Sequence, residues 1–202
     1  RERLPQIIFH GSEPMLNRNA IFTAIDKYKD SFLFGVQTNG TLLDDEAIEF
    51  LTSRGVSIGL SLDGHTKHIA DVVRKTWAGD GVFEKVVHVI KKLKGYQNYS
   101  VICTVARHNM KVLSDIINYF HSLEVPYCML NPIRCTLQGG MNFKPQDYEI
   151  TDYYLKALDR AYELYLKTGK KIIIANFANV LVSIIAPTAR RLMCDISPCG
   201  GG

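Results

Sequence analysis

The sequence alternates short apolar runs with amphipathic segments, and this alternation limits the possible folds more than any other feature. Five apolar runs each end in a turn and lead into a helical pattern, and they cover residues 6–10, 32–36, 56–62, 99–106 and 125–130. Near-continuous apolar runs are typical of parallel strands that are covered on both faces. The pattern therefore predicts an α/β fold with a parallel sheet and helices outside it, either an open sheet or a (β/α) barrel.

Helices are expected between the strands because apolar residues recur there at a spacing of three and four. Asp44 is expected to cap the second helix, and Gly55 lies just past its end. After Pro132 the rhythm changes. A loop over residues 134–148 leads into a long helix that Thr151 is expected to cap and on which the tyrosines of residues 153–165 are expected to form one packed face. A short strand and a further helix are predicted over residues 171–175 and 177–186.

Composition and charge exclude several classes of protein. Hydrophobic residues make up 47% of the 202 residues and charged residues 22%, as in ordinary globular domains. The net charge of +4 is small and the basic residues are spread out, so the sequence predicts neither a nucleic acid nor a membrane as partner. No apolar stretch is long enough to cross a bilayer.

The five cysteines and six histidines give little sign of a metal site. An odd number of cysteines without a secretory signal pattern predicts a reducing, cytoplasmic location rather than disulfides. Cys103 and Cys128 lie in apolar strands and are interpreted as small buried side chains. The histidines show no spacing typical of metal ligands, and they are interpreted as strand-end, loop or helix-surface residues.

Three polar clusters follow the first three apolar runs directly, at residues 10–14, 37–40 and 61–64. Ligands of parallel α/β folds bind at the carboxyl ends of the strands, where these clusters are expected to meet. Each contains a glycine that lets the backbone turn tightly or approach a ligand. Any one of them is explained by turn formation alone. Three on the same rim predict a binding site.

The amino-acid sequences of these clusters resemble the motifs of a known superfamily. Gly-Ser-Glu-Pro follows the first run, Gln-Thr-Asn-Gly-Thr-Leu-Leu the second and Ser-Leu-Asp-Gly the third. In this order the motifs are similar to those of the radical S-adenosylmethionine (SAM) superfamily, in the branch with SPASM domains that includes anaerobic sulfatase-maturating enzymes and peptide maturases. The resemblance implies a partial (β/α) radical SAM barrel over residues 1–133, a helical extension over 134–190 and the start of a truncated SPASM domain over 191–202.

The resemblance also implies which residues bind SAM. The segment formed by Gly11, Ser12 and Glu13 is expected to meet the amino group of the methionyl part, largely through its backbone. Ser12 stands where the family usually has a second glycine. Gln37 is expected to donate or accept a hydrogen bond with SAM, and the backbone near Leu130 is expected to face the adenine.

Ser61 and Arg74 match a pair that holds the methionyl carboxylate of SAM in this family. A guanidinium suits a carboxylate because it donates two parallel hydrogen bonds. The match at Arg74 depends on spacing through a variable segment, so an ordinary surface arginine is the alternative interpretation.

Family members hold a catalytic [4Fe–4S] cluster with three thiolates spaced Cys-x-x-x-Cys-x-x-Cys, and this spacing does not occur here. The sequence is therefore interpreted as a fragment that is inactive by itself. Cys199 resembles the first ligand of an auxiliary [4Fe–4S] cluster, with Cys194 as a weaker candidate. An unrelated cysteine in a Pro-Cys-Gly turn is the alternative for Cys199.

For the intact protein, the resemblance implies an enzyme that cleaves SAM reductively to a 5′-deoxyadenosyl radical. That radical would abstract hydrogen from a peptide or protein, for sulfatase maturation or peptide cross-linking. The expected partners are this substrate and a one-electron donor such as flavodoxin or ferredoxin. Two alternatives stay open, which are a non-catalytic binding scaffold with the same barrel and an ordinary (β/α) barrel enzyme. The second predicts a glycine-rich phosphate site after a late strand, and the sequence has none.

Overall fold

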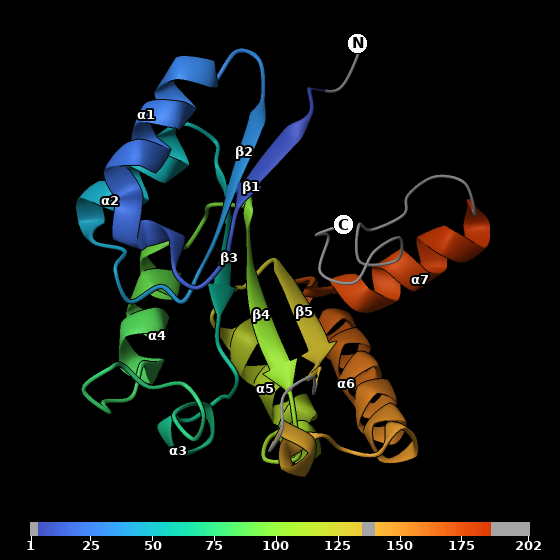
Figure 1. Cartoon of the computed structure of the whole chain (residues 1–202). Helices are drawn as coiled ribbons and strands as arrows, with labels where there is room; N and C mark the ends of the chain where they lie inside the picture. Colours follow the sequence, from blue (N-terminus) through green and yellow to red (C-terminus); the bar gives the residue numbers. More distant parts are fainter. Residues whose placement is uncertain (1–3, 135–139, 187–202) are drawn as a thin grey trace.

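A computed structural model describes residues 4–134 and 140–186 (Figure 1). Its centre is a sheet of six parallel strands in the order β1-β2-β3-β4-β5-β6. The strands are β1 (Gln6–Phe9), β2 (Leu33–Thr38), β3 (Ser57–Ser61), β4 (Tyr99–Val105), β5 (Tyr127–Pro132) and β6 (Ile173–Ile174). Each strand pairs with the next one along the chain, and β1 does not pair with β6. The predicted α/β fold with a parallel sheet is confirmed, in the form of an unclosed, partial barrel.

Helices fill the connections between the strands. They are α1 (Arg18–Tyr28), α2 (Asp45–Ser53), α3 (Lys67–Ala70), α4 (Phe83–Lys92), α5 (Leu113–Ser122), α6 (Asp147–Thr168) and α7 (Ala175–Ile185). Short 3-10 turns are η1 (Pro14–Asn17), η2 (Met110–Val112) and η3 (Gly140–Phe143). Figure 1 shows α1, α2 and α4 beside the first strands, while α5 and α6 lie together next to β4 and β5.

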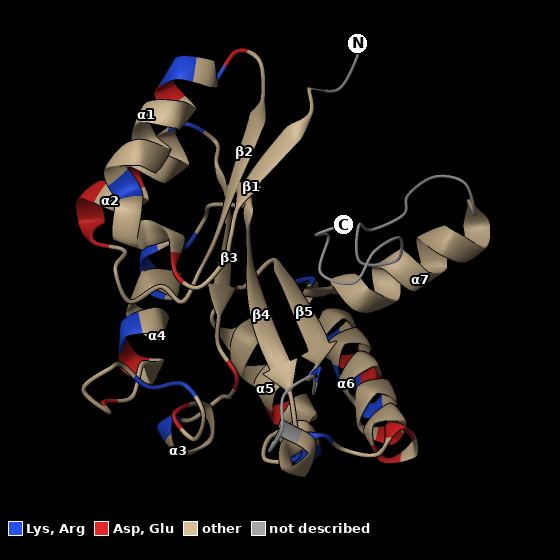
Figure 2. Cartoon of the chain, in the orientation of Figure 1, with Lys and Arg blue, Asp and Glu red and all other residues tan. Residues whose placement is uncertain are grey.

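The two faces of the sheet differ in chemistry. On one face of the sheet, residues of β2 to β5 are buried under the helices and form one core with the inner faces of α2, α4 and α5, while β1 has no fully buried residue. The opposite face mixes small or polar side chains such as Gln37, Ser57 and Gly59 with apolar ones such as Ile102 and Met129, and these residues line a cavity of about 250 Å³. No strand contains a Lys, Arg, Asp or Glu, and Figure 2 shows the charges on helices and loops instead.

The local signals that fix α2 are those that the sequence predicts. The Asp44 carboxylate accepts a hydrogen bond from the backbone N–H of Ala47, at 2.9 Å. Ala47, Ile48 and Leu51 are buried against the sheet. Gly55 follows the helix with a φ of +66°, a conformation that glycine adopts without strain.

Two predicted boundaries are wrong. Strand β5 continues to Pro132 instead of ending before Asn131. A proline is tolerated there because its missing N–H would point away from β4, to the side where β5 has no partner strand at this position. Strand β6 reaches no further along β5 than Cys128, while β4 pairs with β5 as far as Pro132. Helix α6 begins at Asp147 rather than after Thr151. Gln146 and Glu149 form a capping box there.

The tyrosines of α6 do not form one packed face. Ala157 and Ala161 are its buried residues, while Tyr162 is 62% exposed. The prediction fails because the rings are divided: Tyr153 and Tyr154 are half-buried and pack on the core, whereas Tyr162 and Tyr165 are exposed. The end of α6 is as expected, since Gly169 ends it in the left-handed conformation with a φ of +70°.

Helix α7 is apolar along most of its length, yet none of its residues is buried. Its exposed side chains include Val180, Leu181 and Ile184. Among the helices of residues 4–134 and 140–186, none has both the length and the apolar character that a membrane crossing requires.

Candidate functional site

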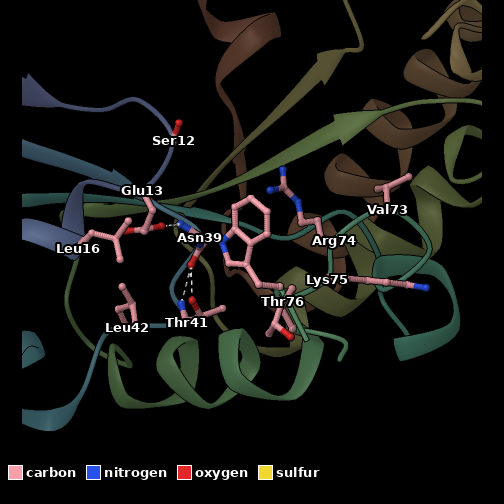
Figure 3. A pocket seen from close by; sticks show the side chains of 12 residues that line it. Ser12, Glu13, Leu16, Asn39, Thr41, Leu42, Val73, Arg74, Lys75 and Thr76 are labelled. Carbon is pink, nitrogen blue, oxygen red and sulfur yellow. Dashed lines mark hydrogen bonds between the residues drawn. The ribbon is translucent and has the colours of Figure 1, made fainter. Parts of the chain in front are cut away.

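Glu13 joins the loops that follow β1 and β2. One oxygen of its carboxylate accepts hydrogen bonds from the Thr38 hydroxyl, at 2.6 Å, and from the backbone N–H of Met15, at 3.0 Å. The other oxygen accepts the backbone N–H of Asn39, at 2.8 Å, which Figure 3 marks with a dashed line. Thr38 is buried. The Glu13 carboxylate is thus engaged with the protein, and it fixes the distance between two strand ends.

The loop after β2 is held by its own side chains. The amide oxygen of Asn39 accepts from the backbone N–H and the hydroxyl of Thr41, at 2.9 and 2.7 Å. The Thr38 hydroxyl also accepts the N–H of Gly40, at 3.1 Å. Gly40 has a φ of +77°, and a Cβ there would lie 3.2 Å from the side chain of Leu60. The Asn-Gly pair of the motif is therefore required by the turn itself.

Asp63 is the most buried charged residue at this rim, with only 1% of its surface exposed. Its carboxylate accepts two hydrogen bonds from the guanidinium of Arg74, from Nε at 2.5 Å and from Nη2 at 3.3 Å. The backbone N–H of Thr104 donates a third, at 2.7 Å. The loop after β3 is therefore attached both to β4 and to the segment that carries Arg74.

Asn109 completes this network from a fully buried position. Its amide nitrogen donates to the backbone oxygens of Asp63 and Thr104, at 2.8 and 2.9 Å. Its amide oxygen accepts the N–H of Ala106, at 2.8 Å. One side chain therefore satisfies backbone groups of two neighbouring loops, which would otherwise be buried without partners.

A cavity of about 500 Å³ lies between these two networks (Figure 3). Its polar lining includes Ser12, Glu13, Asn39 and the cations Arg74 and Lys75, and its apolar lining is Leu16, Leu42, Val73, Trp77 and Val82. The lining thus contains the cations Arg74 and Lys75 as well as the carboxylate of Glu13, whose three hydrogen-bond donors are uncharged. The cavity suits a molecule that combines an anionic group with an apolar body.

Trp77, the single tryptophan of the sequence, is fully exposed at the edge of this cavity. It lies in a tight turn closed by a β-bridge between Lys75 and Gly81. The N–H of Thr76 donates to the oxygen of Asp80 at 2.8 Å within the same turn. The turn thus presents a large aromatic side chain that packs on nothing in the described part of the chain.

The structure divides the predicted SAM-binding residues among three places. Ser12, Glu13 and Arg74 line the cavity, next to Gly11, whose φ of +146° suits glycine. Gln37 lies on the open face of the sheet and lines the smaller cavity.

Ser61 ends β3 beside Ile102 of β4, is half-buried and lines neither of these two cavities. Leu130 is fully buried. Its backbone N–H donates to the amide oxygen of Asn176 at 2.7 Å, and its carbonyl accepts the hydroxyl of Tyr154. Side chains thus take the place of the missing neighbour strand at this edge of β5. The assignment of all these residues to SAM stays a prediction.

The described cysteines lie on the helix-covered side. Cys103 and Cys128 are both fully buried, as predicted. Burial raises the pKa of the Cys103 thiol well above its ordinary value, and the nearby Asp63 carboxylate raises it further. Burial raises the pKa of Cys128 to about 12. Cys135, Cys194 and Cys199 lie outside the described residues, among which no group of three His, Cys, Asp or Glu side chains could hold a metal ion.

His65 and His108 lie in loops, as predicted, but both are half-buried. The ring nitrogens of His108 are both buried without a hydrogen-bond partner in the described ranges, and so is Nδ1 of His65. Burial lowers the pKa of His108, while the Asp63 carboxylate has a smaller, raising effect. No local pattern predicts this burial, because both residues follow strand ends in segments without helical or strand periodicity.

The sequence does not predict the residues whose buried hydrogen bonds hold the rim loops in place. The sequence pattern indicates Asp63 only as part of a turn motif, and it indicates no role for Thr104 or Asn109. Asn109 lies in the polar stretch of residues 107–111 that follows β4, so its sequence neighbourhood does not reveal its burial. Its partners are 46 and 5 residues away.

Comparison with known proteins gives consistent matches. The family description "Radical SAM superfamily" fits residues 1–120. An uncharacterized protein of Archaeoglobus fulgidus is 40% identical over 98% of this chain and 46% of its own length. A cysteine-type anaerobic sulfatase-maturating enzyme of Clostridium perfringens is 30% identical over 88% of this chain and 50% of its own length.

A solved structure agrees with these sequences. Native anSMEcpe with bound AdoMet and the Kp18Cys peptide matches with a TM-score of 0.79 and 25% identity, over 90% of this chain and 53% of that one. The present chain thus spans about half the length of the curated relatives that it matches.

Proposed function

The chain belongs to the radical SAM superfamily, and from this premise we propose that its cavity holds SAM in an enzyme that modifies a peptide or protein. In such an enzyme SAM is cleaved after taking up one electron, and it supplies the carbon radical that removes a hydrogen atom from the substrate. The relatives named above support a peptide substrate, since one matures sulfatases and the other was solved with a peptide. A flavodoxin or ferredoxin as electron donor belongs to the same proposal.

The single observation that carries this proposal is the state of Arg74. Its guanidinium lines the cavity, while Nε and Nη2 are bound to Asp63. Its Nη1 has no partner within the described residues, so two N–H groups are available to a ligand. A carboxylate is the natural acceptor for a guanidinium edge, and SAM has a single carboxylate, on its methionyl part.

The rest of the cavity fits the other parts of SAM. A volume of about 500 Å³ lies within the range of small-molecule sites. The exposed backbone around Gly11 and Ser12 would accept the amino group, and the apolar wall formed by Leu16 and Val73 would cover part of the adenosyl group. We further propose that Ser61 joins Arg74 in holding the methionyl carboxylate, that Gln37 forms a hydrogen bond with SAM, and that the backbone near Leu130 faces the adenine.

The described residues do not fit the [4Fe–4S] cluster that the family implies. Their two cysteines are buried under helices, and burial keeps the pKa of both thiols high, which disfavours the thiolate form that binds iron. We therefore place no cluster ligand among them. Cys199 as ligand of an auxiliary cluster remains a proposal, and it lies outside the described residues.

The chain's own contribution is to hold SAM in a fixed orientation. Glu13 keeps the first two loops at a constant separation, and the network of Asp63, Thr104 and Asn109 does the same for the next two. A rigid rim lowers the entropic cost of placing the reactive carbon against a substrate. The open face of the sheet, which carries no charge in its strands, would face an uncharged part of the peptide.

The test uses full-length protein, reconstituted with iron and sulfide in the absence of oxygen and then reduced. We expect it to form 5′-deoxyadenosine from SAM, measured by chromatography and mass spectrometry, and we expect Arg74→Ala to slow this at least tenfold. No product above a protein-free control would contradict the proposal. SAM binding without any cleavage would instead support the non-catalytic scaffold.

A further inference from the structure

We infer that Asp63 is the positioning residue that aims Arg74 at the carboxylate of its ligand. The inference rests on the proposed function, because it takes SAM as that ligand. It adds a residue that touches neither SAM nor substrate, and it states why the guanidinium stays at the cavity instead of extending into solvent.

The geometry of the pair separates the roles of the two side chains. Asp63 binds the Nε–Nη2 edge of the guanidinium, at 2.5 and 3.3 Å, and Nη1 has no partner in residues 4–134 and 140–186. The Asp63 side chain is 2% exposed and the Arg74 side chain 26%. The carboxylate is thus the fixed member, and the guanidinium is the member that still reaches the cavity. The Thr104 hydroxyl lies 3.4 Å from Nη2 and limits its swing further.

Asp63 is itself held from two sides. Its carboxylate accepts the backbone N–H of Thr104, and its backbone oxygen accepts the amide of Asn109. The next residue is Gly64, where an added Cβ would lie 2.7 Å from the backbone nitrogen of Ala70. The backbone after Asp63 therefore packs directly on α3 and cannot shift. Asp63 is a fixed anchor from which the long arginine side chain is directed.

Fixing Arg74 in advance has a consequence for binding. An unrestrained arginine side chain loses rotational freedom about several bonds when it binds a carboxylate, and this loss of entropy weakens binding. An arginine already clamped at Nε and Nη2 has lost that freedom on folding. The carboxylate of SAM then meets Nη1 as a donor whose position is fixed in advance, so the affinity for SAM depends on Asp63 even though the two carboxylates do not touch.

The molecule contains a matched pair that serves as a control. Asp26 binds Arg54 through the same Nε and Nη2 atoms, at the same 2.5 and 3.3 Å. That pair is on the surface, with the side chains 50% and 32% exposed, and Arg54 stacks on the ring of Phe50. It lines none of the cavities described above. Asp26→Asn therefore removes a pair of equal geometry without touching the proposed receptor.

The experiment measures binding by calorimetry with reconstituted, oxygen-free, full-length protein and two probes, SAM and decarboxylated SAM. Cluster absorbance confirms equal loading of all variants. We expect Asp63→Asn to weaken SAM binding about tenfold, as for the loss of one well-placed charge-assisted hydrogen bond. We expect its affinity for decarboxylated SAM to stay within about twofold of the wild type, because that probe has no carboxylate to orient. Asp26→Asn should change neither affinity.

Three further variants make the inference decisive. Arg74→Ala should lose the preference for SAM, and Asp63→Asn combined with Arg74→Ala should bind SAM no more weakly than Arg74→Ala alone, because both act through one group. Arg74→Lys keeps the charge and the pairing with Asp63 but lacks the second edge of donors. It should lose the preference as well, and it provides the test should Asp63→Asn not fold.

The outcomes separate this inference from the proposed function. Equal weakening of both probes by Asp63→Asn means a merely structural role and overturns the inference. So does an unchanged preference for SAM in Asp63→Asn or in Arg74→Lys. If the wild type itself does not distinguish SAM from decarboxylated SAM, the proposed SAM site fails, and the inference fails with it.

Discussion

The two ends of the sheet treat carboxylates in opposite ways. At the carboxyl end, Glu13 and Asp63 accept backbone N–H groups from a neighbouring strand or loop, and Asp63 is almost completely buried. At the amino end, Asp26 and Glu124 pair with Arg54 and with lysines on the surface. Carboxylates are paired with donors or cations at both ends, but only the carboxyl end contains a buried carboxylate.

This difference indicates where geometry matters. Exposed ion pairs contribute little because water and salt screen them. A buried carboxylate costs much more to desolvate, and hydrogen bonds from fixed N–H groups must offset that cost. Here the buried carboxylates and their hydrogen bonds hold the ends of four strands in fixed relative positions. The carboxyl end is thus the end at which a ligand can be held precisely.

The largest expected effect comes from Asp63→Ala. It leaves the Thr104 N–H and part of the Arg74 guanidinium buried without their acceptor, so we expect the free energy of unfolding to fall by about 3 kcal/mol. Urea denaturation followed by circular dichroism measures this. Asp26→Ala is the control, and an equal loss in both variants would remove the contrast between the two ends.

Glu13→Gln should have the next largest effect. An amide has only one acceptor oxygen, so its NH₂ group must face either the Asn39 N–H or the pair of donors formed by Thr38 and Met15. We expect a loss of about 2 kcal/mol in the free energy of unfolding, from a buried donor without an acceptor. Retention of wild-type stability would show that the two loops are held together by other contacts.

Asp44→Ala tests a carboxylate at the same end that remains exposed. It removes the cap of α2 and should cost about 1 kcal/mol at neutral pH. Hydrogen bonds from the Ala47 N–H and then from Arg18 lower the pKa of Asp44 below its ordinary 3.8. A lowered pKa means that the stabilisation is present above 3.8 and is lost as the pH falls through the folded value.

The measurement for Asp44 is therefore the difference in thermal midpoint between wild type and variant along a pH series. The difference should be constant near neutrality and shrink only in strong acid. A difference that persists unchanged at the acid limit would mean that the side chain acts through packing rather than through its charge.

The smallest effect is expected at the surface pair of Asp26 and Arg54. Arg54 lowers the pKa of Asp26, but both side chains are exposed to water and salt. Asp26→Asn should leave the urea midpoint unchanged within error at moderate salt. A clear loss that disappears at high salt would sharpen the comparison by showing a measurable surface term.

Much of the fold is predictable from the sequence because its signals are local. The apolar runs, the cap at Asp44 and the glycine after α2 each depend on residues a few positions apart. The boundaries of β5 and α6 are wrong because they depend on which side of Pro132 has a partner strand and on a capping pair that begins with Gln146. The first of these is set by the tertiary structure and is not visible in the local pattern.

The candidate site divides along the same line. The motifs that contain Glu13, Gln37 and Ser61 are contiguous in the sequence and can be recognised there, and they lie at the ends of three adjacent strands. The contact between Asp63 and Arg74 crosses a variable loop, and that between Asn109 and Asp63 spans 46 residues. Such contacts form only when the register between β3 and β4 is fixed, so no local pattern reports them.

The exposed tryptophan at the edge of the cavity gives the protein a built-in optical label. Since Trp77 is the single indole of the chain, its fluorescence comes from one place, free of overlap from other indoles. Its emission starts from that of an indole in water, and anything that settles over the cavity moves that ring into a less polar setting and shifts the emission to shorter wavelength. Within this chain, occupancy of the cavity can thus be followed by light alone, in solution and in real time.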